Sequence, residues 1–133
     1  MDINLRKAAT LQEQIRQAIS DINLDTENPN GLRGRLERVE LLELVLYSLR
    51  DKVGKANVET GVSTLLTKRV QLNNLVGRYE KLVRLGLEEY REKLSDFRRN
   101  RVIISENILE LNVSSFVSLN ENDVEVLKNE NIL

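Results

Sequence analysis

A cluster of polar residues in the middle of the chain has the types and the spacing to bind an anion. A helix that starts near Thr60 presents free backbone N–H groups, which suit a phosphate or a carboxylate. Gly61 has no side chain, so a ligand can approach the backbone closely there. The candidate ligand-binding residues are Arg69, Asn57, Thr60, Gly61, Ser63, Thr64 and Lys68. Many helices start with Thr-Gly, so an ordinary helix start is the alternative.

Arg69 also has a structural interpretation. It occupies a position of the helical repeat where a core residue is expected, and an unpaired buried charge costs several kcal/mol. In an antiparallel helix pair that turns near Glu59, Arg69 lies level with about Leu49 and near Asp51. A bridge from Arg69 to Asp51, to Glu43 or to another subunit would fix the register and the assembly. The sequence leaves both roles open.

The composition removes several kinds of enzyme chemistry. The chain has no histidine and no cysteine, which excludes Ser-His-Asp and Cys-His machinery and the common zinc sites. Acidic residues at helical spacing are the remaining metal candidates: Glu37, Glu40, Glu43, Glu88, Glu89, Glu92 and Asp96. Arginine and lysine are interleaved with them, which is typical of solvated helix faces. We therefore expect no catalytic residue, no metal, no cofactor and a protein that is not an enzyme.

The charge pattern argues against a nucleic-acid or membrane partner. The 20 basic and 21 acidic residues give a net charge of -1, and the two signs alternate along the chain. The basic cluster Arg98, Arg99 and Arg101 is small and fits the negative end of a helix dipole. The sequence shows neither a signal peptide nor an apolar run long enough to span a bilayer. We expect a cytoplasmic protein, in a bacterium or an infected host cell.

Three segments have the apolar spacing of amphipathic helices, at about residues 2–23, 32–56 and 60–99. Residues 24–31 contain the only proline beside asparagine and glycine, so the chain turns there. The C-terminal part differs, because residues 102–113 are rich in β-branched or alternating apolar residues, and the strand-like Phe116 and Val117 follow them. They predict a short β-hairpin that turns near residues 105–107.

These elements predict a mainly α protein with a long antiparallel helical hairpin, an N-terminal helix packed along it, and a small C-terminal β-hairpin with a short helix. Ser118 to Glu121 fits a capping box that opens this last helix. We expect a helical bundle or hairpin domain at residues 1–100. Residues 101–133 form a small β and short-helix element packed on it, all within a single domain. Gly77 and Gly86 fall inside the third helix, where a close helix approach or a kink would explain them.

The second helix carries more apolar surface than one neighbouring helix can cover. Leu41, Leu44 and Val45 fall outside its main seam and widen the apolar surface. In a chain with three substantial helices, other subunits are expected to cover it. Tyr79, on the seam of the third helix, completes the candidate oligomer interface. The pattern predicts a homo-oligomer whose helices form a coiled-coil-like bundle across subunits.

The residues around the turn between the second and third helices also resemble a known family. The chain reads RDKVGKANVET at residues 50–60 and LLTKR at residues 65–69. An Asn and a Thr before a Leu-Leu-x-x-Arg helix is similar to the septicolysin-like family of small helical bacterial proteins. The resemblance covers about residues 5 to 125 and departs at Val70, where the family usually has Asp. It implies a helical fold, and the family name implies a cytolysin role.

Two functions from different classes follow. The first is a non-enzymatic, homo-oligomeric interaction protein whose assembly forms the functional surface. The alternative is a binder that sequesters a small anionic or nucleotide-like ligand where the second helix meets the third. In a phage protein, such a binder would act as a counter-defence sponge for a host signal.

Overall fold

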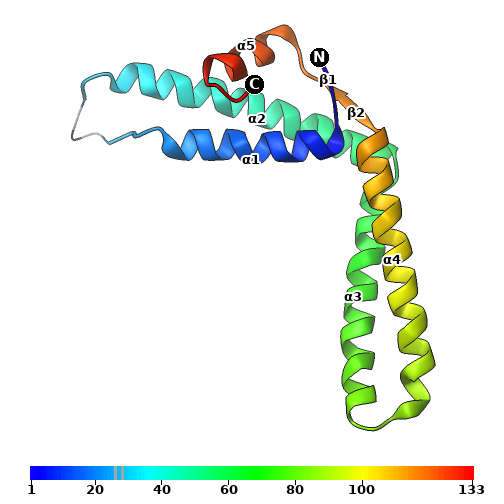
Figure 1. Cartoon of the computed structure of the whole chain (residues 1–133). Coiled ribbons are helices and arrows are strands. Elements are labelled where there is room, and N and C mark those ends of the chain that lie inside the picture. Colours follow the sequence, from blue (N-terminus) through cyan, green and yellow to red (C-terminus); the bar gives the residue numbers. More distant parts are fainter. Residues whose placement is uncertain (26, 28) are drawn as a thin grey trace. The chain divides into compact units, whose positions relative to one another are not determined.

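The computed structural model describes residues 1–25, 27 and 29–133. Its elements are β1 (Asp2–Asn4), α1 (Leu5–Asp21), α2 (Leu32–Glu59), α3 (Val62–Arg84), the 3-10 helix η1 (Glu88–Tyr90), α4 (Arg91–Ser114), β2 (Phe116–Ser118) and α5 (Glu121–Asn129) (Figure 1). The described residues are mainly helical and include a helical hairpin and a small antiparallel sheet. The predicted fold class is confirmed at this level. The predicted turn at residues 24–31 includes residues 26 and 28, which lie outside the described residues.

The chain divides into two compact units. Unit 1 contains residues 1–56 and 115–133, and unit 2 contains residues 57–114. Residues 100 and 101, where the sequence suggested a change of character, both lie inside α4.

Unit 2 is a hairpin of α3 and α4, which run antiparallel and side by side (Figure 1). The predicted third helix at residues 60–99 is therefore wrong in its extent, because α3 ends at Arg84. Gly86 adopts a left-handed φ of 91°. The N–H of Leu87 donates to the carbonyl of Leu82 at 3.2 Å, and the N–H of Gly86 donates to that of Val83 at 3.0 Å. This is a Schellman ending, so Gly86 reverses the chain instead of kinking one long helix.

The predicted strands at residues 102–113 are also wrong, since this stretch is the second half of α4. Its inward residues follow helical spacing through the whole element: Leu94, Phe97, Arg101, Ile104, Ile108 and Leu111. The β-branched preference for strands is weak and yields to packing, here against α3. The basic cluster at residues 98–101 consequently lies in the middle of a helix.

The sheet of unit 1 joins the two ends of that unit. β1 and β2 pair antiparallel, with Ile3 opposite Val117, and the N–H of Leu119 donates to the carbonyl of Met1 at 2.8 Å. Lys52 of α2 donates from its ammonium to the carbonyl of Ser118 at 2.7 Å. Each strand has three residues, which is too short to give a period of two in the sequence.

The core of unit 1 lies between α1, α2, α5 and the sheet. Its completely buried side chains include Ile15, Leu42 and Leu127. The short helix begins at Glu121 as predicted, but its cap is Asn120, whose side chain accepts from the N–H of Asp123 at 2.8 Å. The core therefore fixes α5 against α1 and α2.

Gly77 and Gly86, two of the three glycines of unit 2, give opposite predictions. A Cβ added at Gly77 meets nothing within 4 Å, so no close helix approach explains this residue. Gly77→Ala should stabilise the protein by about 1 kcal/mol through helix propensity. Gly86→Ala should destabilise it by about 1 kcal/mol, because alanine at a φ of 91° is strained. Urea unfolding followed by circular dichroism measures both, and shifts of the same sign would contradict the assignment of Gly86 as the helix end.

The ion pair between Arg38 and Glu130 gives a pH-dependent prediction. Arg38 of α2 donates two hydrogen bonds, at 2.9 and 2.7 Å, to the carboxylate that follows α5. The hydrogen bond and the charge of Arg38 lower the pKa of Glu130 below its ordinary value. A lowered pKa stabilises the fold above the unfolded-state pKa, and this stabilisation disappears as the pH falls through the folded-state pKa.

Glu130→Gln should therefore cost roughly 1 kcal/mol at neutral pH. The difference from the wild type should begin to shrink as the pH falls below about 4.3, the ordinary pKa of Glu, and should vanish once the pH is below the lowered pKa of Glu130. Thermal unfolding at several pH values measures this. Glu13→Gln is the matched control, because Glu13 pairs with Arg16 on the exposed surface of α1. A difference that persists unchanged in acid would show that the effect of Glu130→Gln is not electrostatic.

Candidate functional site

The predicted anion site lies at the start of α3, and its N-cap is Gly61 and not Thr60. Gly61 adopts a left-handed φ of 83° and provides no side-chain cap. The helix begins at Val62, so Ser63 and Thr64 belong to its first turn. Thr60 precedes the cap, and Asn57 lies in the last turn of α2.

The candidate residues on α3 point in different directions. Arg69 is half-buried and lies two turns after Val62, on the face that packs in the hairpin. Thr64 and Lys68 are exposed and one turn apart, on another face. Thr67 uses its hydroxyl to donate to the carbonyl of Ser63 at 3.2 Å. The fold thus distributes these side chains around the helix, and anion sequestration stays a prediction.

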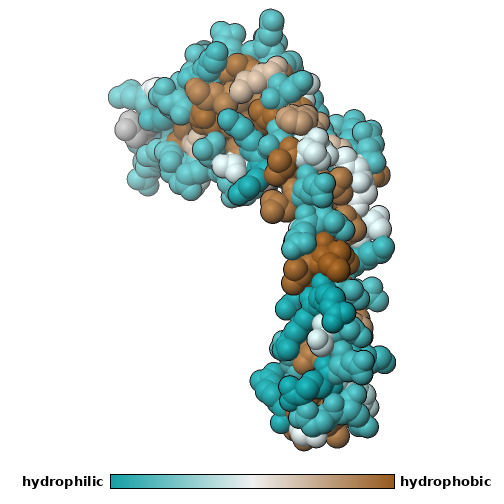
Figure 2. Space-filling model, turned by 45° about the vertical axis from the view of Figure 1, so that its right-hand side comes forward, coloured by the Kyte–Doolittle hydropathy of each residue, from teal (hydrophilic) through white to brown (hydrophobic). Residues whose placement is uncertain are grey.

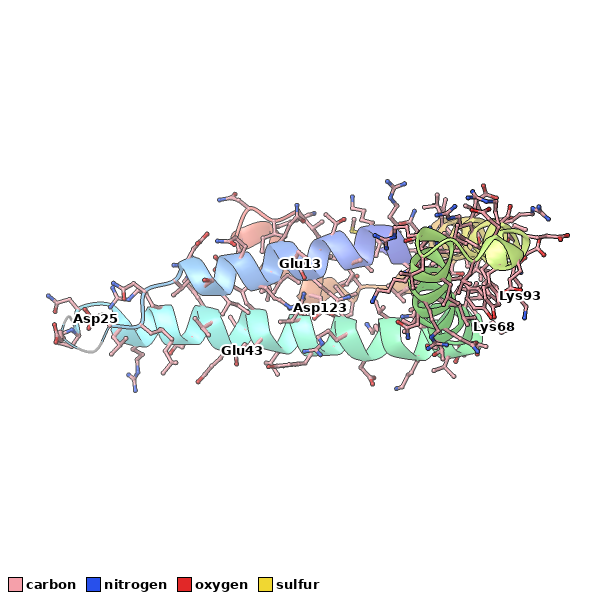
Figure 3. The ribbon with its side chains drawn as sticks, turned by 90° about the horizontal axis from the view of Figure 1, so that it is seen from below. Glu13, Asp25, Glu43, Lys68, Lys93 and Asp123 are labelled. Carbon is pink, nitrogen blue, oxygen red and sulfur yellow. The ribbon has the colours of Figure 1, made fainter. Side chains whose placement is uncertain are left out.

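Lys68 does line a small hollow of about 310 Å³ between α3 and α4 (Figure 3 shows Lys68). The other lining residues are Gln71, Leu72, Asn100, Ile103 and Ile104. Lys68 is the one charged residue of this lining. Among the described residues, Arg69 makes no ion pair, while Asp51 pairs with Lys55 of its own helix at 3.0 Å.

The candidate oligomer interface divides into exposed and buried members. Leu41 and Leu44 are 49% and 69% exposed, as expected of an interface. Val45 is 2% exposed and packs in the core of unit 1, because one residue along a helix turns the side chain by about 100°. Val45 is consequently not available to a second subunit. Tyr79 is half-buried and packs edge-on against Tyr90 and Phe97.

The surface of α2 that faces away from the core combines leucines with carboxylates. We call it the outer face of α2, and it consists of Leu36, Glu37, Glu40, Leu41, Leu44 and Tyr47. Four of its members, Glu37, Glu40, Leu41 and Leu44, enclose a hollow of about 310 Å³. Neither carboxylate forms an ion pair within the described part of the chain. The outer face of α2 therefore carries exposed leucines beside carboxylates that have no ion-pair partner among the described residues.

Sequence reasoning missed a second surface of unit 1, a groove of about 990 Å³ between α1 and α5. We call it the α1–α5 groove. Its lining includes Arg6, Lys7, Thr10, Val124, Lys128 and Ile132, and it contains no acidic side chain. Arg6, Lys7 and Lys128 make no ion pair with any described residue. The residues are far apart in the sequence and meet through the β1–β2 pairing, so no local motif signals the groove.

Unit 2 also exposes apolar side chains, which gather on part of the hairpin surface (Figure 2). Val70 of α3 and Val102 and Ile103 of α4 are exposed near the middle of the hairpin. Inside unit 2, all of whose residues the structure describes, the buried apolar residues are Val62, Val76, Leu94 and Ile108. The hairpin thus has a narrow core for its length.

The placement of the acidic side chains and the composition of the helices bear on metal binding and on membrane insertion. Glu13, Glu43 and Asp123 come from three different helices (Figure 3), and no three acidic side chains of the described residues are grouped to hold a metal ion. No helix in the described part is long and apolar enough to cross a membrane.

Comparison of the chain with protein-family models, curated proteins and solved structures gives no match. Its function must therefore be inferred from its own surfaces.

Proposed function

We propose that this chain is a non-enzymatic interaction protein that assembles with copies of itself, and that the assembly forms the functional surface. The outer face of α2 carries this proposal. α2 already buries Val39, Leu42 and Leu49 in the core of unit 1, yet it exposes Leu41 and Leu44 on the opposite side. A helix that is apolar on both sides requires a second covering surface.

Covering these residues favours association. Fully burying an exposed leucine contributes about 1.5 to 3 kcal/mol. Leu41 and Leu44 are 49% and 69% exposed, so covering both contributes roughly 2 to 3.5 kcal/mol. Leu36 and Tyr47 extend the same surface along α2. The acidic Glu37 and Glu40 beside them keep the monomer soluble and select the partner surface by charge.

Sedimentation of the full chain over a range of concentrations tests the proposal. We expect an oligomer for the wild type, and a double variant Leu41→Gln with Leu44→Gln should weaken association by roughly 100-fold. Leu85→Gln is the control, because Leu85 is 77% exposed at the end of α3 in unit 2 and should leave the mass unchanged. A wild type that stays monomeric at high concentration would overturn the proposal, as would a double variant with unchanged association.

A further inference from the structure

We infer that the outer face of α2 in one copy docks in the α1–α5 groove of a second copy. This inference rests on the proposed self-assembly and names the two surfaces that meet. Both surfaces belong to unit 1, and their residues come from different helices. One copy can therefore donate its outer face and accept a neighbour in its groove at the same time.

The two surfaces have opposite charges that the single chain leaves unmatched. The groove presents Arg6, Lys7 and Lys128 with no acidic residue in its lining. The outer face presents Glu37 and Glu40, and these five side chains form no ion pair with any residue that the structure describes. Docking places the carboxylates among the cations, which favours the correct partner and speeds association.

The apolar parts of the two surfaces also correspond. Val124 and Ile132 supply apolar lining to the groove, and Leu41 and Leu44 line the hollow of the outer face together with the two carboxylates. Each surface thus combines apolar side chains with charge. Specific interfaces bury apolar side chains and keep charged groups toward the rim.

The charges favour this contact over pairing of two outer faces. If α2 packed on α2 of a second copy, Glu37 and Glu40 of both copies would gather around the same leucines. Like charges at an interface oppose association. A face that meets a different face forms a heterologous, head-to-tail contact, which generates a closed ring or an open chain of subunits.

Charge reversal with rescue tests the inference on the full chain. Lys128→Glu alone and Glu40→Lys alone should each weaken association at least tenfold, measured by sedimentation at low salt. The chain that carries both substitutions should regain most of the affinity. An equal mixture of the two single variants should also assemble. The reversed groove of one variant can bind the reversed outer face of the other, and the two remaining wild-type surfaces can bind each other. Lys81→Glu is the control, because Lys81 is exposed on α3 of unit 2, and it should leave association unchanged.

The outcomes separate this inference from the proposed function. If the wild type does not associate, both are overturned. If Leu41→Gln with Leu44→Gln weakens association but Lys128→Glu does not, self-assembly stands and the docking arrangement is wrong. If both single charge variants weaken association and neither the double variant nor the mixture recovers it, the docking arrangement is also overturned. Circular dichroism of each variant confirms that it folds, and Arg6→Glu replaces Lys128→Glu if the latter unfolds.

Discussion

Replacing Leu127 with alanine should cost about 3 kcal/mol of stability, the typical loss for a leucine truncated in a tight core. Leu127 is 0% exposed and belongs to the core cluster that joins α5 to α1 and α2. Its carbonyl also accepts from the N–H of Ile132 at 2.9 Å, where the chain turns after α5. Few other side chains link the C-terminal segment to the core as completely as Leu127 does.

Urea unfolding of Leu127→Ala measures this loss, and Leu127→Met is the matched control. Methionine has a similar volume, so it should cost less than about 1.5 kcal/mol. Val126→Ala, at a half-buried neighbour on α5, should cost less than Leu127→Ala. A loss below about 1 kcal/mol for Leu127→Ala would mean that the core relaxes around the cavity or that α5 detaches easily.

Leu127→Ala also probes the α1–α5 groove, because Leu127 anchors α5 in the core and its neighbour Lys128 lines the groove. We expect Leu127→Ala to weaken self-association even at concentrations where the monomer is folded. Leu127→Met should preserve it. This difference between the two variants would show that self-association depends on the packing of α5, and that the weaker association of Leu127→Ala does not come from a general loss of folding.

The sequence predicted the helices well where burial and helical spacing agree. α1 and most of α2 follow the apolar spacing of one core face. α5 begins at Glu121 as predicted, although its N-cap is Asn120 and not the Ser118 of the predicted capping box. Leu41 and Leu44 are exposed, as their positions outside the main seam of α2 suggested. Local periodicity contains this information because each helix has a single dominant core face.

The predictions failed where tertiary packing or the backbone conformation of a single residue determines the structure. The spacing of residues 60–99 is compatible with one helix, and the left-handed Gly86 alone divides it. The β-branched residues at 102–113 suit a strand, but packing on α3 makes them helical. The α1–α5 groove depends on pairing between β1 and β2, whose residues lie at opposite ends of the sequence. No local pattern encodes such a contact.

Tyr79→Ala should cost about 3 kcal/mol, similar to other aromatic truncations in cores. The Tyr79 ring lies 5.5 Å from that of Tyr90 at an interplanar angle of 75°, and 5.1 Å from that of Phe97 at 67°. Both are edge-to-face contacts, each worth about 0.5 to 1.5 kcal/mol beyond the buried area. The three rings join α3, η1 and α4 at the closed end of the hairpin, and the completely buried residues of unit 2 are few.

Tyr79→Phe is the control for Tyr79→Ala, since it keeps the ring and should change stability by less than about 1 kcal/mol. Hydrogen exchange of α3 and α4 localises the effect, and Tyr79→Ala should accelerate exchange there while α1 and α2 stay protected. The dependence of the stability loss on protein concentration distinguishes a role of Tyr79 in the hairpin core from a role at a subunit interface. If Tyr79 acts in the hairpin core, the loss is the same in dilute and concentrated protein. If it acts at a subunit interface, as the sequence suggested, the loss appears only where the protein is assembled, because association stabilises the folded state by mass action.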